Sequence, residues 1–83
     1  MNKKGGEIKV AYDYSKLNGK IIEVYGTRGA FAEAMEISDR TLSLKLNNLT
    51  SWKQPEITKA CKLLKLEQDE IQDYFFDLKV QEV

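Results

Sequence analysis

The stretch that decides the fold is residues 27–47, TRGAFAEAMEISDRTLSLKLN. Thr27 is a residue type that caps helix N-termini, and the apolar residues after it fall on one face of a short helix. Ser38 is a second capping residue, and Leu42 and Leu46 mark the buried face of a second short helix. Two short helices joined by a tight turn predict a helix-turn-helix.

The second of these helices carries another stripe on its outer side. Its members follow helical spacing and are Arg40, Ser43, Leu44 and Asn47. Arg and Asn side chains can bond base edges in the DNA major groove, and a leucine can touch thymine methyl groups. This stripe predicts a DNA recognition helix over residues 38–47.

Simpler interpretations stand beside this one. Leu44 could be a core residue of a slightly rotated helix, and Arg40 could be an ordinary solvated arginine. Asp39 suits the dipole of a first helical turn better than a base contact, because a carboxylate repels phosphate. Lys45 and Lys53 are expected at the surface, where they would favour a phosphate backbone.

The length and composition limit the classes of protein that fit. The chain has 83 residues, which indicates one domain, and its 13 Lys/Arg balance 13 Asp/Glu. Residues 1–53 hold nine Lys/Arg against six Asp/Glu, so the helix-turn-helix lies in the positive part. With no histidine and the single Cys61, metal sites built from Cys and His are excluded. No run approaches membrane-spanning length and no secretory signal is visible, which favours the cytoplasm.

Apolar periodicity predicts the remaining elements. Residues 1–6 are polar and glycine-containing, as in a flexible arm, and the alternation in residues 7–14 predicts a strand. Ser15 is expected to cap a first helix that Gly26 ends. Pro55 suits the first position of a fourth helix.

The C-terminal part allows two interpretations. Ile71, Tyr74, Phe75 and Leu78 share a helical face, whereas Phe76, Leu78 and Val80 alternate as in a strand of the tail 77–83. The predicted fold is therefore one mainly α domain of five helices over residues 1–83. A short strand at each chain end is left as an alternative. Trp52, Cys61 and the aromatic residues of the two ends are expected in the core first, with Trp52 alternatively in an interface.

Five runs carry a resemblance to a known family: YDYSKLNGKIIEVYGT, FAEAMEIS, RTLSLKLNN, WKQPEI and YFF. They resemble the Cro and CI repressors of lambdoid phages, and more narrowly a group of short phage-encoded Cro-like proteins. The resemblance implies a lambda-repressor-like helix-turn-helix domain and a small repressor that binds operators as a dimer. Residues 1–11 have no counterpart.

The resemblance also implies roles for individual residues. Arg28, at the start of the second helix, stands where these proteins touch phosphate. The exposed face of the recognition helix corresponds to Ser38, Asp39, Arg40, Ser43 and Leu44. Glu36 occupies a turn position that is commonly glycine, and a positive φ there costs about 1 kcal/mol.

These observations predict a sequence-specific regulator of transcription that binds double-stranded operator DNA. The predicted DNA-binding residues are Arg28, Ser38, Asp39, Arg40, Ser43, Leu44, Lys45, Asn47 and Lys53. A homodimer through the C-terminal segment is expected, without cofactor, metal, small-molecule substrate or membrane. Catalysis is not expected, since the chain has neither histidine nor a glycine-rich phosphate loop. The alternative is a protein-binding adaptor or antirepressor that uses the same fold.

Overall fold

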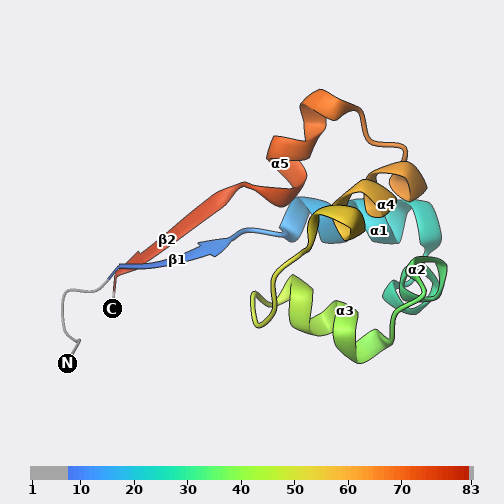
Figure 1. The fold of residues 1–83 in the computed structure, drawn as a ribbon, viewed down its shortest axis with the longest axis horizontal. Helices are drawn as coiled ribbons and strands as arrows, with labels where there is room; N and C mark the ends of the chain where they lie inside the picture. The colour runs from blue at the N-terminus through green and yellow to red at the C-terminus, as the bar shows by residue number, and fades with distance from the viewer. Residues whose placement is uncertain (1–7, 83) are drawn as a thin grey trace.

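Helices dominate the computed structural model, which describes residues 8–82 and the side chains of residues 11–79 (Figure 1). The predicted arm, residues 1–6, lies outside the described residues. The elements in chain order are β1 (Ile8–Tyr12), α1 (Ser15–Tyr25), α2 (Arg28–Met35), α3 (Asp39–Leu46), α4 (Gln54–Leu64), the 3-10 turn η1 (Gln68–Glu70), α5 (Ile71–Phe75) and β2 (Leu78–Glu82). The predicted fold class, five helices with a short strand at each end, is confirmed.

Two predicted caps begin the helix-turn-helix. The Thr27 hydroxyl accepts a hydrogen bond from the Ala30 N–H at 3.1 Å, and α2 follows. The Ser38 hydroxyl accepts from the Thr41 N–H at 3.0 Å, and α3 follows. Each bond satisfies an N–H that has no partner inside its own helix.

The start of α1 differs from the prediction, because Ser15 is not the capping acceptor. Its N–H and its hydroxyl both donate to Oδ1 of Asp13, at 2.9 and 2.6 Å. These bonds, the side-chain one first, lower the pKa of Asp13 and keep its carboxylate charged. The acceptor is therefore two residues upstream of the predicted one, since a carboxylate outcompetes a hydroxyl for an N–H.

Left-handed backbone ends three of the segments. Glu36 has φ 65°, as expected for a turn position that usually holds glycine. Asn48 has φ 63° after α3, and Gly26 has φ 85° after α1. Asparagine and glycine tolerate this region with little steric cost, whereas Glu36 is strained there.

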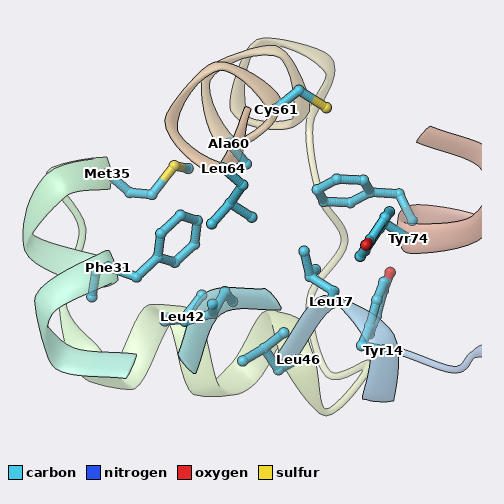
Figure 2. Packing of buried hydrophobic residues seen from close by; sticks show 13 residues of the cluster. Tyr14, Leu17, Phe31, Met35, Leu42, Leu46, Ala60, Cys61, Leu64 and Tyr74 are labelled. Atoms are coloured by element: carbon cyan, nitrogen blue, oxygen red, sulfur yellow. The ribbon is translucent and has the colours of Figure 1, made fainter. Parts of the chain in front are cut away.

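The core is formed where α1, α2, α3, α4 and α5 meet (Figure 2). Figure 2 shows the side chains of Phe31, Met35 and Leu64 pointing toward one another from α2 and α4. Phe31 of α2 and Leu42 of α3 are both buried, and Leu42 was predicted on the buried face of its helix. Cys61 is buried as well, and this burial raises the pKa of its thiol.

The two chain ends form an antiparallel ribbon that projects from the helices (Figure 1). Its register pairs Ile8 with Glu82 and Tyr12 with Leu78. The helical interpretation that ran through Leu78 is wrong, because α5 ends at Phe75 and the strand alternative holds for Leu78–Glu82. Pairing with β1 supplies the backbone hydrogen bonds that a continued helix would have made.

The base of the ribbon is tied to the helical body. The Asp13 N–H donates to the Asp77 carbonyl at 2.7 Å, just beyond the paired strands. Asn48 bonds the backbone of Tyr12 twice, accepting from its N–H at 2.9 Å and donating to its carbonyl at 2.8 Å. An isolated two-stranded ribbon is marginally stable in water, so these contacts determine how firmly it is held. Within residues 8–82, no helix is long and apolar enough to cross a membrane.

Candidate functional site

The outer face of α3 is arranged as its sequence stripe predicts. Arg40 and Asn47 are exposed, and Ser43 and Leu44 are half-buried. The Asn47 amide donates to the Ser43 hydroxyl at 3.3 Å, so these two polar groups are partly satisfied within the helix. Leu44 therefore fits neither interpretation fully: it is not a core residue, and it is not fully exposed for contact with a partner.

The N-terminal residues of α3 contact their own chain. The Ser38 hydroxyl, already the cap of α3, also donates to the Thr41 hydroxyl at 2.9 Å. Asp39 is exposed, and its Oδ1 would lie 3.5 Å from a Cβ placed on Gly29. This carboxylate therefore lies over the first turn of α2, where a negative charge suits the helix dipole.

Lys45 is the clearest departure from the predicted site. Its side chain is buried, with Nζ 2.8 Å from Glu56 Oε1 and 3.0 Å from the Ser51 carbonyl. Nζ also lies 5.8 Å from the centre of the Trp52 ring. The prediction of a surface lysine for phosphate is wrong, because Lys45 shares the inner face of α3 with Leu42.

Glu56, which is half-buried, is the carboxylate partner of Lys45. Its Oε1 accepts from Lys45 and also from the Lys53 N–H at 2.8 Å, at the start of α4. Burial alone would raise the pKa of Glu56, but the hydrogen bonds and the two lysine charges lower it overall. The helix starts at Gln54, one residue before the predicted Pro55.

The other two predicted cations remain at the surface. Arg28 is exposed at the first position of α2, and its Nε donates to Asn18 Oδ1 at 2.8 Å. The Lys53 side chain is exposed, at the N-cap of α4. The predicted set is thus divided, with Lys45 inside and Arg28, Arg40 and Lys53 outside.

An aromatic cluster lies where the ribbon joins the helices. It consists of Tyr12, Tyr14, Trp52, Phe75 and Phe76. Ring centres are 5.1 Å apart for Trp52 and Phe75 and 5.8 Å apart for Tyr12 and Phe76, both in edge-to-face geometry. Burial raises the pKa of the Tyr14 hydroxyl. Such packing fixes the ring positions more tightly than apolar burial alone.

This cluster lines a hollow of about 370 Å³, here called the aromatic hollow, with Ile57 and loop residues 48–51. No Lys, Arg, Asp or Glu is among its lining residues. Leu49 and Phe76 are large apolar residues at its rim, with exposed fractions of 69% and 37%. Apolar side chains held in water beside a hollow are typical of a protein-binding surface.

A second hollow, here called the polar hollow, lies on the other side of Asn48 and Leu49. Its volume is about 550 Å³, and it shares Tyr12, Tyr14, Asn48 and Leu49 with the aromatic hollow. Its charged lining residues are Asp13, Arg28 and Lys79. The two hollows thus form one continuous surface with an apolar half and a charged half.

Sequence reasoning did not single out Leu49. The signal that could have found it is an isolated leucine in the polar run NNLTS, where no helical stripe requires an apolar residue.

Within residues 8–82, no group of His, Cys, Asp or Glu side chains could hold a metal ion.

Comparison with known proteins gives a family match and a similar solved structure. A family model described as "Protein of unknown function (DUF739)" matches residues 10–78. A solution structure of the modulator of repression of the temperate bacteriophage TP901-1 from Lactococcus lactis is 54% identical, with a TM-score of 0.70. That match covers 78% of this chain and 88% of the other. No curated protein matches the chain.

These findings correct the main functional prediction. At 54% identity the chain is similar to a modulator of repression, which contradicts an operator-binding repressor and favours the protein-binding alternative. The prediction that the partner is double-stranded DNA is therefore wrong. The predicted dimer also loses its basis, because it was argued from a repeat in the operator. The broader expectation of a phage regulator of transcription is supported. The resemblance to Cro and CI stays a prediction.

Proposed function

The chain belongs to the DUF739 family, and from that premise we propose that it is a modulator of phage repression that works by binding a repressor protein. The observation that carries this proposal is the 54% identity to the TP901-1 modulator of repression over 78% of the chain. We propose binding without catalysis. The helix-turn-helix serves in this protein as a scaffold for protein contact.

The charge arrangement of α3 supports a protein partner. A helix that reads DNA is surrounded by cations that contact phosphates, and these contacts dominate its affinity. The Lys45 ammonium instead forms an ion pair with Glu56 and donates to the Ser51 carbonyl inside the protein. Arg40 is left as the cation on the outer face of α3, and Asp39 adds a carboxylate beside it.

The test uses the repressor encoded in the same phage genome and a fluorescently labelled operator. We expect the chain to form a complex with the free repressor, detectable by size-exclusion chromatography with light scattering. Adding the chain to a preformed repressor–operator complex should change the fluorescence anisotropy of the operator, because modulation requires a shift in operator occupancy. The chain and the operator without repressor form the control, for which no anisotropy change is expected.

Two results contradict this proposal. One is the absence of a chain–repressor complex at micromolar concentrations. The other is direct binding of the chain to the labelled operator with an affinity equal to that of the repressor. Either result would mean that repression is modulated without the protein contact proposed here.

A further inference from the structure

Leu49 is held in a fixed, exposed position between the two hollows. The preceding Asn48 is bonded twice to the backbone of Tyr12, at 2.9 and 2.8 Å. The Leu49 N–H donates to the Leu44 carbonyl at 2.9 Å, which ties the residue to the end of α3. The Leu49 side chain is 69% exposed, and because its backbone is already held, covering it costs little additional backbone entropy.

The aromatic hollow beside Leu49 suits an apolar side chain. Its lining has no Lys, Arg, Asp or Glu, so an apolar group enters without stripping water from a charge. Trp52 lines this hollow, and its indole Nε1 is buried without a hydrogen-bond partner among the described residues.

The polar hollow on the other side of Leu49 suits a carboxylate. Arg28 presents five N–H donors, of which Nε is engaged by Asn18, and this bond orients the guanidinium. Lys79 is exposed in the same hollow. The carboxylate of Asp13, which also lies there, already accepts two hydrogen bonds from Ser15. Arginine held in this way favours planar carboxylate recognition.

We propose that the two hollows together, with Leu49 as the ridge between them, form the surface that binds the repressor. This inference rests on the proposed function. The repressor segment that fits has an apolar residue for the aromatic hollow and an Asp or Glu next to it for Arg28. The outer face of α3 around Arg40 lies outside this contact.

Trp52 is the only tryptophan of the chain and lines the aromatic hollow, so it is a built-in probe. The full chain is produced with 5-fluorotryptophan and titrated with the unlabelled repressor from the same phage genome. We expect the single fluorine resonance to shift on binding. Labelled chain with operator DNA alone is the second arm, and it should leave the resonance in place.

Variants separate the two halves of the surface. Leu49→Ala should raise the Kd for the repressor by about tenfold or more, as expected for a central interface anchor. Arg28→Gln should weaken binding and also reduce its dependence on salt, because a charge pair is lost. Ile22→Ala and Val24→Ala are matched controls, since both residues are 43% exposed on α1 and away from the hollows, and they should leave the Kd unchanged.

The outcomes distinguish this inference from the function on which it rests. If the parent chain forms no complex with the repressor, the proposed function fails and the binding surface fails with it. If the complex forms but Leu49→Ala and Arg28→Gln bind as the parent does, the surface is elsewhere and the function stands. A loss of binding in Arg40→Ala alone would place the contact on α3, and a fluorine shift with DNA alone would overturn the protein partner.

Discussion

The outer face of α3 and the aromatic hollow are joined by the loop between α3 and α4, yet they present opposite chemistry. The face of α3 shows an exposed arginine and asparagine with little apolar area. The hollow shows aromatic rings and an exposed leucine, with no charged lining residue. The motif that predicts DNA binding from sequence is therefore intact, while the surface best suited to a partner lies beside it.

Lys45 connects the two regions and explains their difference. Turned inward, it removes a cation from the helix that would meet phosphate. The same side chain bonds the Ser51 carbonyl and lies over the Trp52 ring, so it also braces the wall of the aromatic hollow.

The largest effect is expected where the inner face of α3 meets the core. Leu42 is 1% exposed, and Leu42→Ala should lower the free energy of unfolding by about 2–5 kcal/mol, measured by urea denaturation. Leu44→Ala is the control, since Leu44 is half-buried on the other side of the same helix and should cost less. Equal losses of unfolding free energy in both variants would mean that α3 has no distinct outer face, which would contradict the contrast between α3 and the aromatic hollow.

The Lys45–Glu56 pair that links the two regions should have the next largest effect. Glu56→Gln leaves the Lys45 ammonium without its carboxylate, and we expect a loss of about 1.5–3 kcal/mol. Because the folded-state pKa of Glu56 is lowered, its contribution is complete above the ordinary value of 4.5 and is lost as pH falls through the lower folded-state pKa. Unfolding measured from pH 3 to 7 should show this dependence in the parent chain and a weaker one in the variant.

Glu36→Gln is the matched control for that experiment. Glu36 pairs with Lys59 at 3.1 Å, but its side chain is 81% exposed, so the change should be within about 0.5 kcal/mol. Trp52 fluorescence provides a second readout, because the lysine lies over that ring. If Glu56→Gln altered neither stability nor emission, Lys45 would not be bracing the hollow.

The smallest effect is expected at the tie between the loop and the ribbon. Asn48→Ala removes both hydrogen bonds to Tyr12 and places alanine at φ 63°, for a loss of about 1–2 kcal/mol. Asn48→Gly removes the same bonds without the steric cost, so it should be less harmful. Hydrogen exchange at the Tyr12 amide should speed up in both variants, and unchanged protection would show that Asn48 does not hold the ribbon.

Local signals in the sequence were enough for most of the fold. Thr27 and Ser38 cap α2 and α3 as predicted, since a capping hydroxyl acts on an N–H three residues away. Glu36 has the expected left-handed backbone, which follows from its position in the turn. The cap of α1 was wrong by two residues because Asp13 and Ser15 are both competent acceptors, and only geometry selects one.

The candidate site was predictable in part. The outer stripe of α3 is where its helical spacing puts it, and Arg28 is exposed at the start of α2. Lys45 was misplaced because a lysine between two helical faces can point either way. Leu49 was missed because the hollow beside it is formed largely by aromatic residues from the two ends of the chain, which no local pattern relates to Leu49.

By itself the sequence determined most of the helices, because caps, apolar period and turn residues act over a few positions. It left the C-terminal tail open between a helix and a strand. Only the tertiary structure decided which side chains point inward and where the hollows lie on the surface. Glu56 lies 11 positions beyond Lys45 and draws it inward, and Asn48 reaches Tyr12 across 36 positions. Contacts of this kind join side chains that no local pattern relates, so the direction of a buried charge and the shape of a hollow arise when the helices pack.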